Sequence, residues 1–247
     1  MSEHKFNFKN DFKRANKYWN SHFRFTADVH DRLNSFWETN FSGKTVLGVH
    51  YRGTDKNVDT WQANPVSRYQ FLCVVEDFLK SHPDVTAIFV ASDDAKFIEA
   101  MRNFSNARFY DQQRSEDGRP LWNQQKGSGN EAASKDAILD SLTLARCRYG
   151  LKCMSQLSAF SKVINPELEI YRVSACKPGW FPEAYVPLYR SADRAAQSLL
   201  NTLQEGDFQA PPLSKILALP RRLSGIAEQW QRRGTHVPLI SRLLSRK

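Results

Sequence analysis

The sequence predicts an α/β fold in which helices cover both faces of a parallel β-sheet. Short apolar segments rich in β-branched residues recur along the chain, and we expect buried strands at 44–50, 85–91, 149–153 and 168–173. Segments with apolar residues at helical spacing separate these strands. This alternation is typical of a parallel sheet. Because crossover connections are right-handed, the carboxyl ends of the strands should lie along one edge of the sheet.

The first predicted helix covers residues 28–41 and leads into the first strand. Asp28 is its expected N-cap, and Ser42-Gly43 ends it. Its apolar face consists of Val29, Leu33, Phe36 and Trp37. This face should pack on the sheet.

The remaining helices follow the strands in turn. We expect one helix from Pro65 to His82-Pro83, one around 97–104, one over 134–147 and one over 157–164, with a short strand candidate at 107–110. Residues 111–133 form the longest predicted loop, which is charged and rich in glycine. A loop of that length in a compact domain is typically functional or mobile.

Changes in composition divide the chain into three parts. Residues 1–27 are polar and aromatic, and the aromatic side chains indicate that this segment packs on the main domain or on a partner. Residues 28–190 contain the alternating strands and helices. Residues 191–247 form a basic tail with helical character, in which arginines alternate with leucines and isoleucines over 213–247. That stretch fits peripheral contact with an anionic membrane, and it equally fits a solvated helix or a disordered basic end.

Charge and composition limit the class of function. The 247 residues carry a net charge of +9 with a pI of about 9.4, which favours a polyanionic surface or a phosphorylated ligand. No RNA-binding, zinc-finger or helix-turn-helix signature is present, so a basic nucleic-acid-binding protein is only a lesser alternative. The N-terminus has no apolar core of a signal peptide, and no apolar run is long enough to span a membrane.

The cysteines predict neither a zinc site nor a redox motif. Cys73, Cys147, Cys153 and Cys176 form no CxxC pair and have no zinc-ligand spacing, so we expect no metal. Free cysteines in apolar segments are usually small buried hydrophobes. A reducing, cytoplasmic location is therefore the simpler expectation, with membrane-peripheral attachment through the tail as its variant.

Polar clusters follow three of the predicted strands: Arg52-Gly-Thr-Asp55, Ser92-Asp-Asp94 and Ser155-Gln-Leu-Ser158. If the sheet is parallel, all three clusters meet along one edge, where ligands of open α/β sheets bind. The alternative is that they are ordinary polar turns.

The clusters contain the groups needed to bind an anion. Arg52 offers a rigid fork of donors to a phosphate, and Ser155 opens a helix whose N-terminal amides favour negative charge. Ser155 could instead cap its own helix. Asp93 or Asp94 could accept hydrogen bonds from a sugar or base, or hold Arg52. For Ser92 and Asp93 the alternative is that they cap a helix. His50, at the end of the first strand, could contact the ligand or serve as an orienting core residue.

Known phosphate-binding motifs are absent from the sequence. It contains no GxxxxGK[ST] and no GxGxxG after a first strand. A P-loop enzyme and a dinucleotide oxidoreductase are therefore disfavoured, and a nucleotide would be held by a less glycine-dependent site.

Three ordered motifs resemble those of the GT-B fucosyltransferases of the bacterial nodulation α-1,6 and animal core type. His50-Tyr-Arg-Gly-Thr-Asp-Lys56 is similar to the first, and Ile88-Phe-Val-Ala-Ser-Asp-Asp94 to the second. The third matches the stretch from Asp136 through Asp140 to Arg146, followed by Ser155-Gln-Leu-Ser158 and Asn165-Pro166. The resemblance covers roughly residues 28–173.

The resemblance implies that residues 28–190 are the Rossmann-like, nucleotide-sugar-binding half of a GT-B fold. It implies inverting, metal-independent transfer of fucose from GDP-fucose to a glycan or glycoconjugate, with no further cofactor. Arg52 would contact the diphosphate and stabilise departing GDP, Asp93 would bind the guanine or ribose side or support the arginine, and Ser155 would contact the β-phosphate. Arg52 is thus an implied catalytic residue. A general base would have to come from the remaining polar groups of its loop, Asp55, Lys56 and Asp59, or from the 111–133 loop, and Asp55 and Lys56 are taken here as the further catalytic candidates. The predicted substrate-binding residues are His50, Arg52, Gly53, Ser92, Asp93, Asp94, Asp140, Ser155, Gln156 and Ser158.

The sequence departs from the family pattern in three respects. The core enzymes carry a second arginine where Gly53 stands, and a glutamate proposed to act near the acceptor would fall at Thr60, beside Asp59. The segment before the first motif is short for an acceptor domain. Three alternatives stay open: the chain begins late, it uses a reduced acceptor region made from 1–27 and the tail, or it is a non-catalytic GDP-sugar-binding remnant.

Overall fold

The computed structural model describes residues 8–54, 66–119, 129–173, 181–193 and 197. The chain divides into two compact units, residues 1–190 and 191–247. Of the predicted helical tail 191–247, the structure describes only residues 191–193 and 197, and the basic segment 213–247 lies entirely outside the described residues.

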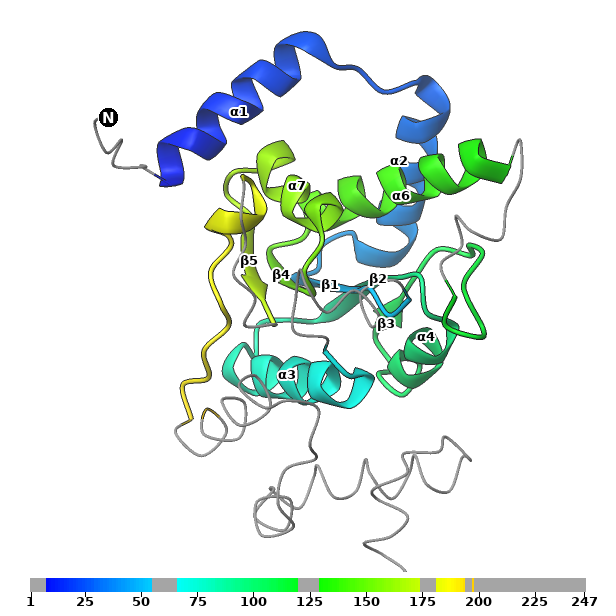
Figure 1. Cartoon of the computed structure of the whole chain (residues 1–247), viewed down its shortest axis with the longest axis vertical. Coiled ribbons are helices and arrows are strands. Elements are labelled where there is room, and N and C mark those ends of the chain that lie inside the picture. Colours follow the sequence, from blue (N-terminus) through cyan, green and yellow to red (C-terminus); the bar gives the residue numbers. More distant parts are fainter. Residues whose placement is uncertain (1–7, 55–65, 120–128, 174–180, 194–196, 198–247) are drawn as a thin grey trace, which may run out of the picture. The chain divides into compact units, whose positions relative to one another are not determined.

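The centre of the first unit is a parallel five-stranded sheet of order β3-β2-β1-β4-β5, which confirms the predicted fold class (Figure 1). The strands are β1 (Val46–Tyr51), β2 (Ala87–Ser92), β3 (Ala107–Arg108), β4 (Tyr149–Lys152) and β5 (Glu169–Arg172). The chain moves outward from β1 to β3 and then returns to β4 on the other side of β1. The strand order therefore reverses between β1 and β4, which is the position where open α/β sheets bind their ligands.

Helices cover both faces of the sheet (Figure 1). One face carries α3 (Arg68–Ser81) and α4 (Ala95–Met101), and the other carries α2 (Ala27–Phe41), α6 (Gly129–Arg146) and α7 (Gln156–Ile164). Gly48 faces α6, because a Cβ there would lie 2.8 Å from Leu144 Cδ2. Tyr51 faces the opposite side, where its ring stacks on Phe97 of α4 at 4.3 Å. Since side chains alternate along a strand, His50 points to the same side as Gly48.

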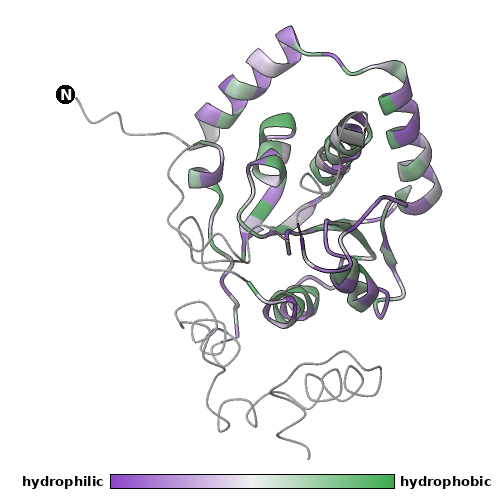
Figure 2. Cartoon of the chain, turned by 45° about the vertical axis from the view of Figure 1, so that its right-hand side comes forward, coloured by the Kyte–Doolittle hydropathy of each residue, from purple (hydrophilic) through white to green (hydrophobic). Residues whose placement is uncertain are grey.

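The hydrophobic core lies between the sheet and the helices, and the strands are coloured mostly as hydrophobic in Figure 2. Val29 and Leu33 of α2 pack there with Leu139 of α6 and with Phe89 of β2. Complete burial of each such side chain stabilises the fold by about 1.5–3 kcal/mol. The predicted apolar face of the first helix therefore does pack toward the sheet.

The aromatic N-terminal segment contains helix α1 (Phe8–His22), which packs against α7. Phe12 is buried, and its ring lies 5.2 Å from that of Phe181. Asn16 donates hydrogen bonds to the carbonyl oxygens of Val163 and Ile164, at 2.9 and 2.8 Å. These carbonyls belong to the last turn of α7, where intrahelical partners are missing.

Three predicted helix starts are wrong. Thr26, not Asp28, is the N-cap of α2, and Asp28 lies in the first turn, where a hydrogen bond from Thr26 lowers its pKa. Helix α3 begins at Arg68 rather than Pro65, because Ser67 and Gln70 form a capping box. Helix α6 begins at Gly129, five residues before the predicted start, and shortens the predicted long loop.

Candidate functional site

Asp93 holds the loop that follows β1. The backbone amide of Gly53 donates to Asp93 Oδ1 at 2.9 Å, and the hydroxyl of Thr54 donates to Oδ2 at 2.6 Å. Both carboxylate oxygens thus bind the two residues that come directly after Arg52. Among the roles expected for Asp93, these two hydrogen bonds fit that of holding the loop that carries Arg52.

Asp94 is the N-cap of α4 and the partner of an arginine. Its Oδ1 accepts from the amide of Phe97 at 3.1 Å, and its Oδ2 accepts from Arg68 Nε at 2.8 Å and Nη2 at 2.7 Å. The amide of Asp94 donates to Ser92 Oγ at 3.1 Å. Helix α4 is therefore capped by Asp94, and not by Ser92 or Asp93 as the capping alternative had it. Arg68 was not predicted as a site residue. Its place at the start of a helix is an available signal, because positive charge is unfavourable near a helix N-terminus.

Gly53 is required by the close approach of this loop to β2. A Cβ at Gly53 would overlap the carboxylate of Asp94 and would lie 2.6 Å from Tyr51 Cε1. The position can therefore hold no larger side chain in this arrangement, including the arginine of the family pattern.

Ser155 is the N-cap residue of α7, but its side chain does not cap the helix. Its Oγ is buried and has no hydrogen-bond partner in the described structure. Gln156 is exposed, while Ser158 is buried and donates to the carbonyl of Ser155 at 3.3 Å. The alternative that Ser155 serves as a side-chain cap is therefore not what the structure shows. Its hydroxyl and the first amides of α7 are suited to an anion.

His50 is buried, and its Nδ1 also has no hydrogen-bond partner in the described structure. Burial and then the positive charges of Lys152 and Arg52 lower its pKa to about 3. The imidazole is therefore neutral at neutral pH and can either donate or accept one hydrogen bond at each nitrogen. The amide of Cys153 donates to the carbonyl of His50 at 3.0 Å, so the ends of β1 and β4 are joined directly.

A buried ion pair adjoins His50 and Ser155. Lys152 Nζ lies 2.7 Å from Glu183 Oε1 and 2.5 Å from Oε2, and the two side chains are 0% and 2% exposed. The amide of Ser155 donates to Glu183 Oε2 at 3.3 Å. Glu183, on the 3₁₀ helix η2 (Glu183–Tyr185), thus ties β4 to the start of α7. This pair was not predicted from the sequence, although a lysine within an apolar strand is an available signal.

Asp140 lies on α6 and contacts the segment after β3. Gln112 Nε2 donates to its Oδ1 at 3.3 Å, and Arg114 is nearby. Burial raises the pKa of the Asp140 carboxyl to about 7. Its described contacts do not include the β1 loop. Asp55 and Lys56, with Asp59 and Thr60, lie outside the described residues.

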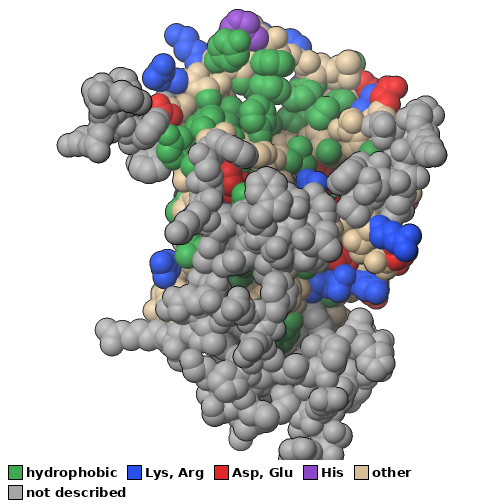
Figure 3. Space-filling model, in the orientation of Figure 1, with side chains coloured by type: hydrophobic (Ala, Val, Ile, Leu, Met, Phe, Trp, Pro, Cys, Tyr) green, Lys and Arg blue, Asp and Glu red, His purple; other side chains and the backbone are tan. Residues whose placement is uncertain are grey.

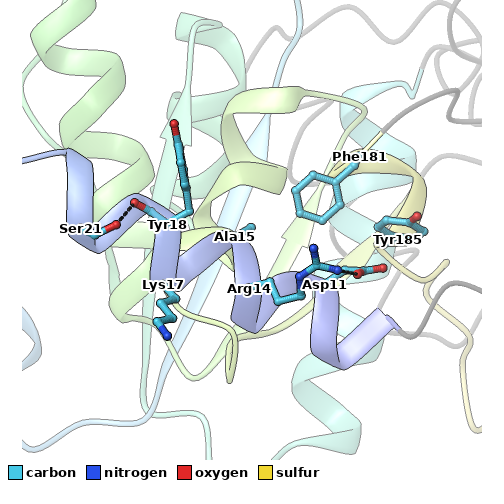
Figure 4. A pocket seen from close by; sticks show the side chains of 8 residues that line it. All are labelled: Asp11, Arg14, Ala15, Lys17, Tyr18, Ser21, Phe181 and Tyr185. Atoms are coloured by element: carbon cyan, nitrogen blue, oxygen red, sulfur yellow. Dashed lines mark hydrogen bonds and ion pairs between the residues drawn. The ribbon is translucent and has the colours of Figure 1, made fainter.

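An open pocket of about 710 Å³ lies between α1 and the η2 segment (Figure 4). It is lined by Asp11, Arg14, Ala15, Lys17, Tyr18, Ser21, Phe181 and Tyr185. The side chains of Tyr18 and Phe181 are 62% and 39% exposed, and apolar side chains gather on the upper part of the face in Figure 3. None of the predicted ligand-binding residues lines this pocket, but η2 connects it to Glu183.

The described residues contain no cluster of three or more His, Cys, Asp or Glu side chains arranged to hold a metal ion. Among the helices that the structure describes, none combines the length and apolar character needed to cross a bilayer.

The described residues form an α/β domain with a Rossmann-like parallel sheet, and buried polar side chains gather where its strand order reverses. No protein-family model matches the sequence, and no curated protein matches it. Among solved structures, the chain is similar to the fucosyltransferase NodZ from Bradyrhizobium, with 18% identity, 65% of this chain and 48% of that chain covered, and a TM-score of 0.45. It is also similar to POFUT1 in complex with GDP-fucose (14%, 60% and 46%, TM-score 0.37) and to a mutant of Arabidopsis thaliana FUT1 in complex with GDP (13%, 62% and 34%, TM-score 0.40). The chain spans about half the length of NodZ and of POFUT1 and about a third of the length of FUT1.

Proposed function

We propose that the chain is a glycosyltransferase that binds the diphosphate of a nucleotide sugar between the ends of β1 and β4. The observation that carries this proposal is that His50 Nδ1 and Ser155 Oγ are both buried there and have no hydrogen-bond partner among the described residues. A buried polar atom that lacks a hydrogen bond costs about 1–3 kcal/mol, so such atoms call for a specific partner. A ligand that accepts from Ser155 and bonds His50 would supply it.

The neighbouring groups favour an anionic ligand. Arg52 supplies a permanent positive charge, and its loop is fixed by Asp93. The N-terminus of α7 adds free amides and the positive end of the helix dipole. Together these groups would neutralise a diphosphate without a metal ion.

The three sequence motifs support GDP-fucose as the donor. In an inverting transfer, a hydroxyl oxygen of the acceptor forms a bond to the anomeric carbon while the bond from that carbon to the β-phosphate oxygen breaks. The electron pair leaves with GDP, and the proton of the hydroxyl passes to a base. Arg52 would stabilise the charge that develops on the leaving diphosphate. On the motif alone, Asp55 and Lys56 are the other proposed catalytic residues, and His50, Gly53, Ser92, Asp93, Asp94, Asp140, Gln156 and Ser158 complete the proposed donor site.

The pocket between α1 and η2 is the place that we propose for the glycan acceptor. The exposed rings of Tyr18 and Phe181 offer flat apolar surfaces to the C–H faces of sugar rings, and Asp11 and Arg14 can bond sugar hydroxyls. The pocket lies one short helix away from the proposed donor site, because Glu183 of η2 bonds Ser155. Peripheral contact of 213–247 with an anionic membrane and a cytoplasmic location remain predictions.

A panel of nucleotide sugars tests the proposal. Isothermal titration should show binding of GDP and GDP-fucose in preference to UDP-sugars, and mass spectrometry should detect fucosylated product from a glycan library. Arg52→Ala should weaken GDP binding at least tenfold, because one charge-assisted hydrogen bond is worth about 1.5–3 kcal/mol. GDP binding without turnover would instead identify a non-catalytic GDP-sugar-binding protein. Unchanged GDP affinity in Arg52→Ala would show that the site is assigned wrongly.

A further inference from the structure

Arg68 occupies a position that helix stability does not explain. It is the first residue of α3, where its positive charge faces the positive end of the helix dipole. The amino end of α3 follows the β1 loop, so Arg68 lies on the edge of the sheet that carries the proposed donor site. A cation that is held against the local field points to another use.

Asp94 fixes the guanidinium of Arg68 but leaves part of it available. The Asp94 side chain is 1% exposed, whereas that of Arg68 is 36% exposed. Asp94 accepts from Nε and Nη2, and the described residues offer Nη1 no hydrogen bond. The fork is therefore held in one orientation with donors directed away from Asp94, which lowers the entropy cost of binding a ligand.

Arg68 is also close to the loop that carries Arg52. Asp94 Oδ2, which lies 2.7 Å from Arg68 Nη2, is the same atom that leaves no room for a Cβ at Gly53. Asp94 Oδ2 therefore lies between the guanidinium of Arg68 and Gly53, the residue that follows Arg52. The consecutive residues Asp93 and Asp94 thus hold two arginine-bearing segments side by side.

We propose that Arg68 is a second anion-binding side chain of the donor site and donates a hydrogen bond to a phosphate oxygen of the nucleoside diphosphate. This inference rests on the proposed function. It assigns Asp94 a positioning role, since its carboxylate holds the guanidinium in place while both of its oxygens remain bound to the protein.

Two variants test the proposal without leaving a buried charge unpaired. Arg68→Gln combined with Asp94→Asn replaces the ion pair by a neutral hydrogen-bonded pair, and Arg68→Lys keeps the charge but removes the fork. Titration calorimetry should show that the double variant binds GDP about tenfold more weakly, with a smaller dependence on salt. Arg68→Lys should give an intermediate loss. The matched control is Arg102→Gln, which removes an exposed arginine paired with Glu99 at the other end of α4 and should leave GDP affinity unchanged.

The outcomes separate this inference from the proposed function. If the unaltered protein binds GDP, Arg52→Ala loses it, and both Arg68 variants stay within twofold of the unaltered affinity, Arg68 is purely structural and the inference is wrong. A lower melting temperature with unchanged GDP affinity leads to the same conclusion. If the unaltered protein binds neither GDP nor any nucleotide sugar, the proposed function fails and the inference fails with it.

Discussion

The buried pair of Lys152 and Glu183 allows a sharp test of how the site is held together. Lys152→Met keeps most of the side-chain volume but removes the ammonium that lies 2.7 and 2.5 Å from the two carboxylate oxygens. Glu183 is 2% exposed, so solvent cannot replace the lost partner. Breaking one half of a buried pair costs about 3–5 kcal/mol.

This loss is large compared with the stability of a domain. Native domains are stable by about 5–15 kcal/mol, and for a domain of this size each kcal/mol changes the melting temperature by about 2–4 °C. The melting temperature of Lys152→Met should therefore fall by about 10 °C. Combined replacement by Lys152→Met and Glu183→Leu should recover most of the loss, because a buried pair can be exchanged for apolar side chains at little cost.

Urea unfolding monitored by circular dichroism measures these differences. The matched control is Lys135→Met, because Lys135 Nζ lies 3.2 Å from Glu131 in a pair whose side chains are 44% and 76% exposed. That change should cost less than about 1 kcal/mol. A cost below 1 kcal/mol for Lys152→Met, or a double variant as unstable as the sum of the two single variants, would refute the reasoning.

Three further predictions follow from the geometry. Gly53→Ala should destabilise the domain by about 1–3 kcal/mol in urea unfolding and weaken GDP binding, because the added Cβ overlaps Asp94. If the variant keeps both the stability and the GDP affinity of the original chain, the close approach at Gly53 is contradicted. Burial raises the pKa of Asp140 to about 7, so its contribution to stability is complete below about pH 4 and is lost as the pH rises through 7. Asp140→Asn should therefore raise the melting temperature at pH 8 but not at pH 4, and equal effects at both pH values would disprove it. Tyr18→Ala should raise the KM for a glycan acceptor and leave GDP affinity unchanged, whereas Phe23→Ala, which removes an exposed ring outside the pocket, should change neither.

The strands could be predicted from the sequence because burial on both faces leaves an almost continuous apolar run. This holds for β1 and β2, in which every residue is buried. Of β5 only Ile170 is buried, and that strand was found from the longer apolar run around it. Strand β3 lies within the short strand candidate at 107–110. Helix starts were harder to predict. The first residues of α6, such as Glu131 and Ala132, are exposed, so the apolar period begins only where the helix reaches the sheet. For α3, the hydrogen bonds of the capping box between Ser67 and Gln70 set the start, and the apolar pattern does not show it.

The site could be predicted only in part, for a related reason. The meeting of three strand ends on one edge follows from parallel topology, and the sheet confirms it. Which of two consecutive aspartates holds the arginine loop depends on where the chain folds back, and no local pattern encodes that. The partners of Asp94 and Lys152 are Arg68 and Glu183, which lie 26 and 31 residues away in sequence. Contacts of that separation depend on the finished fold.

The two kinds of polar group on this edge differ in a way that favours a ligand. Asp94 and Lys152 are buried and bonded to protein partners, as expected for a structural role. His50 Nδ1 and Ser155 Oγ, at the ends of β1 and β4, are buried, and the part of the chain that the structure describes offers neither a hydrogen-bond partner. If this edge of the sheet had only a structural role, pairing or replacing each of these atoms would stabilise the fold by about 1–3 kcal/mol. The chain satisfies the groups that hold the loop and the start of α7, and it leaves unsatisfied the two that border the point where the strand order reverses. This difference between paired and unpaired groups is expected of a preorganised binding site, in which structural groups are paired within the protein and the remaining polar groups bond the ligand.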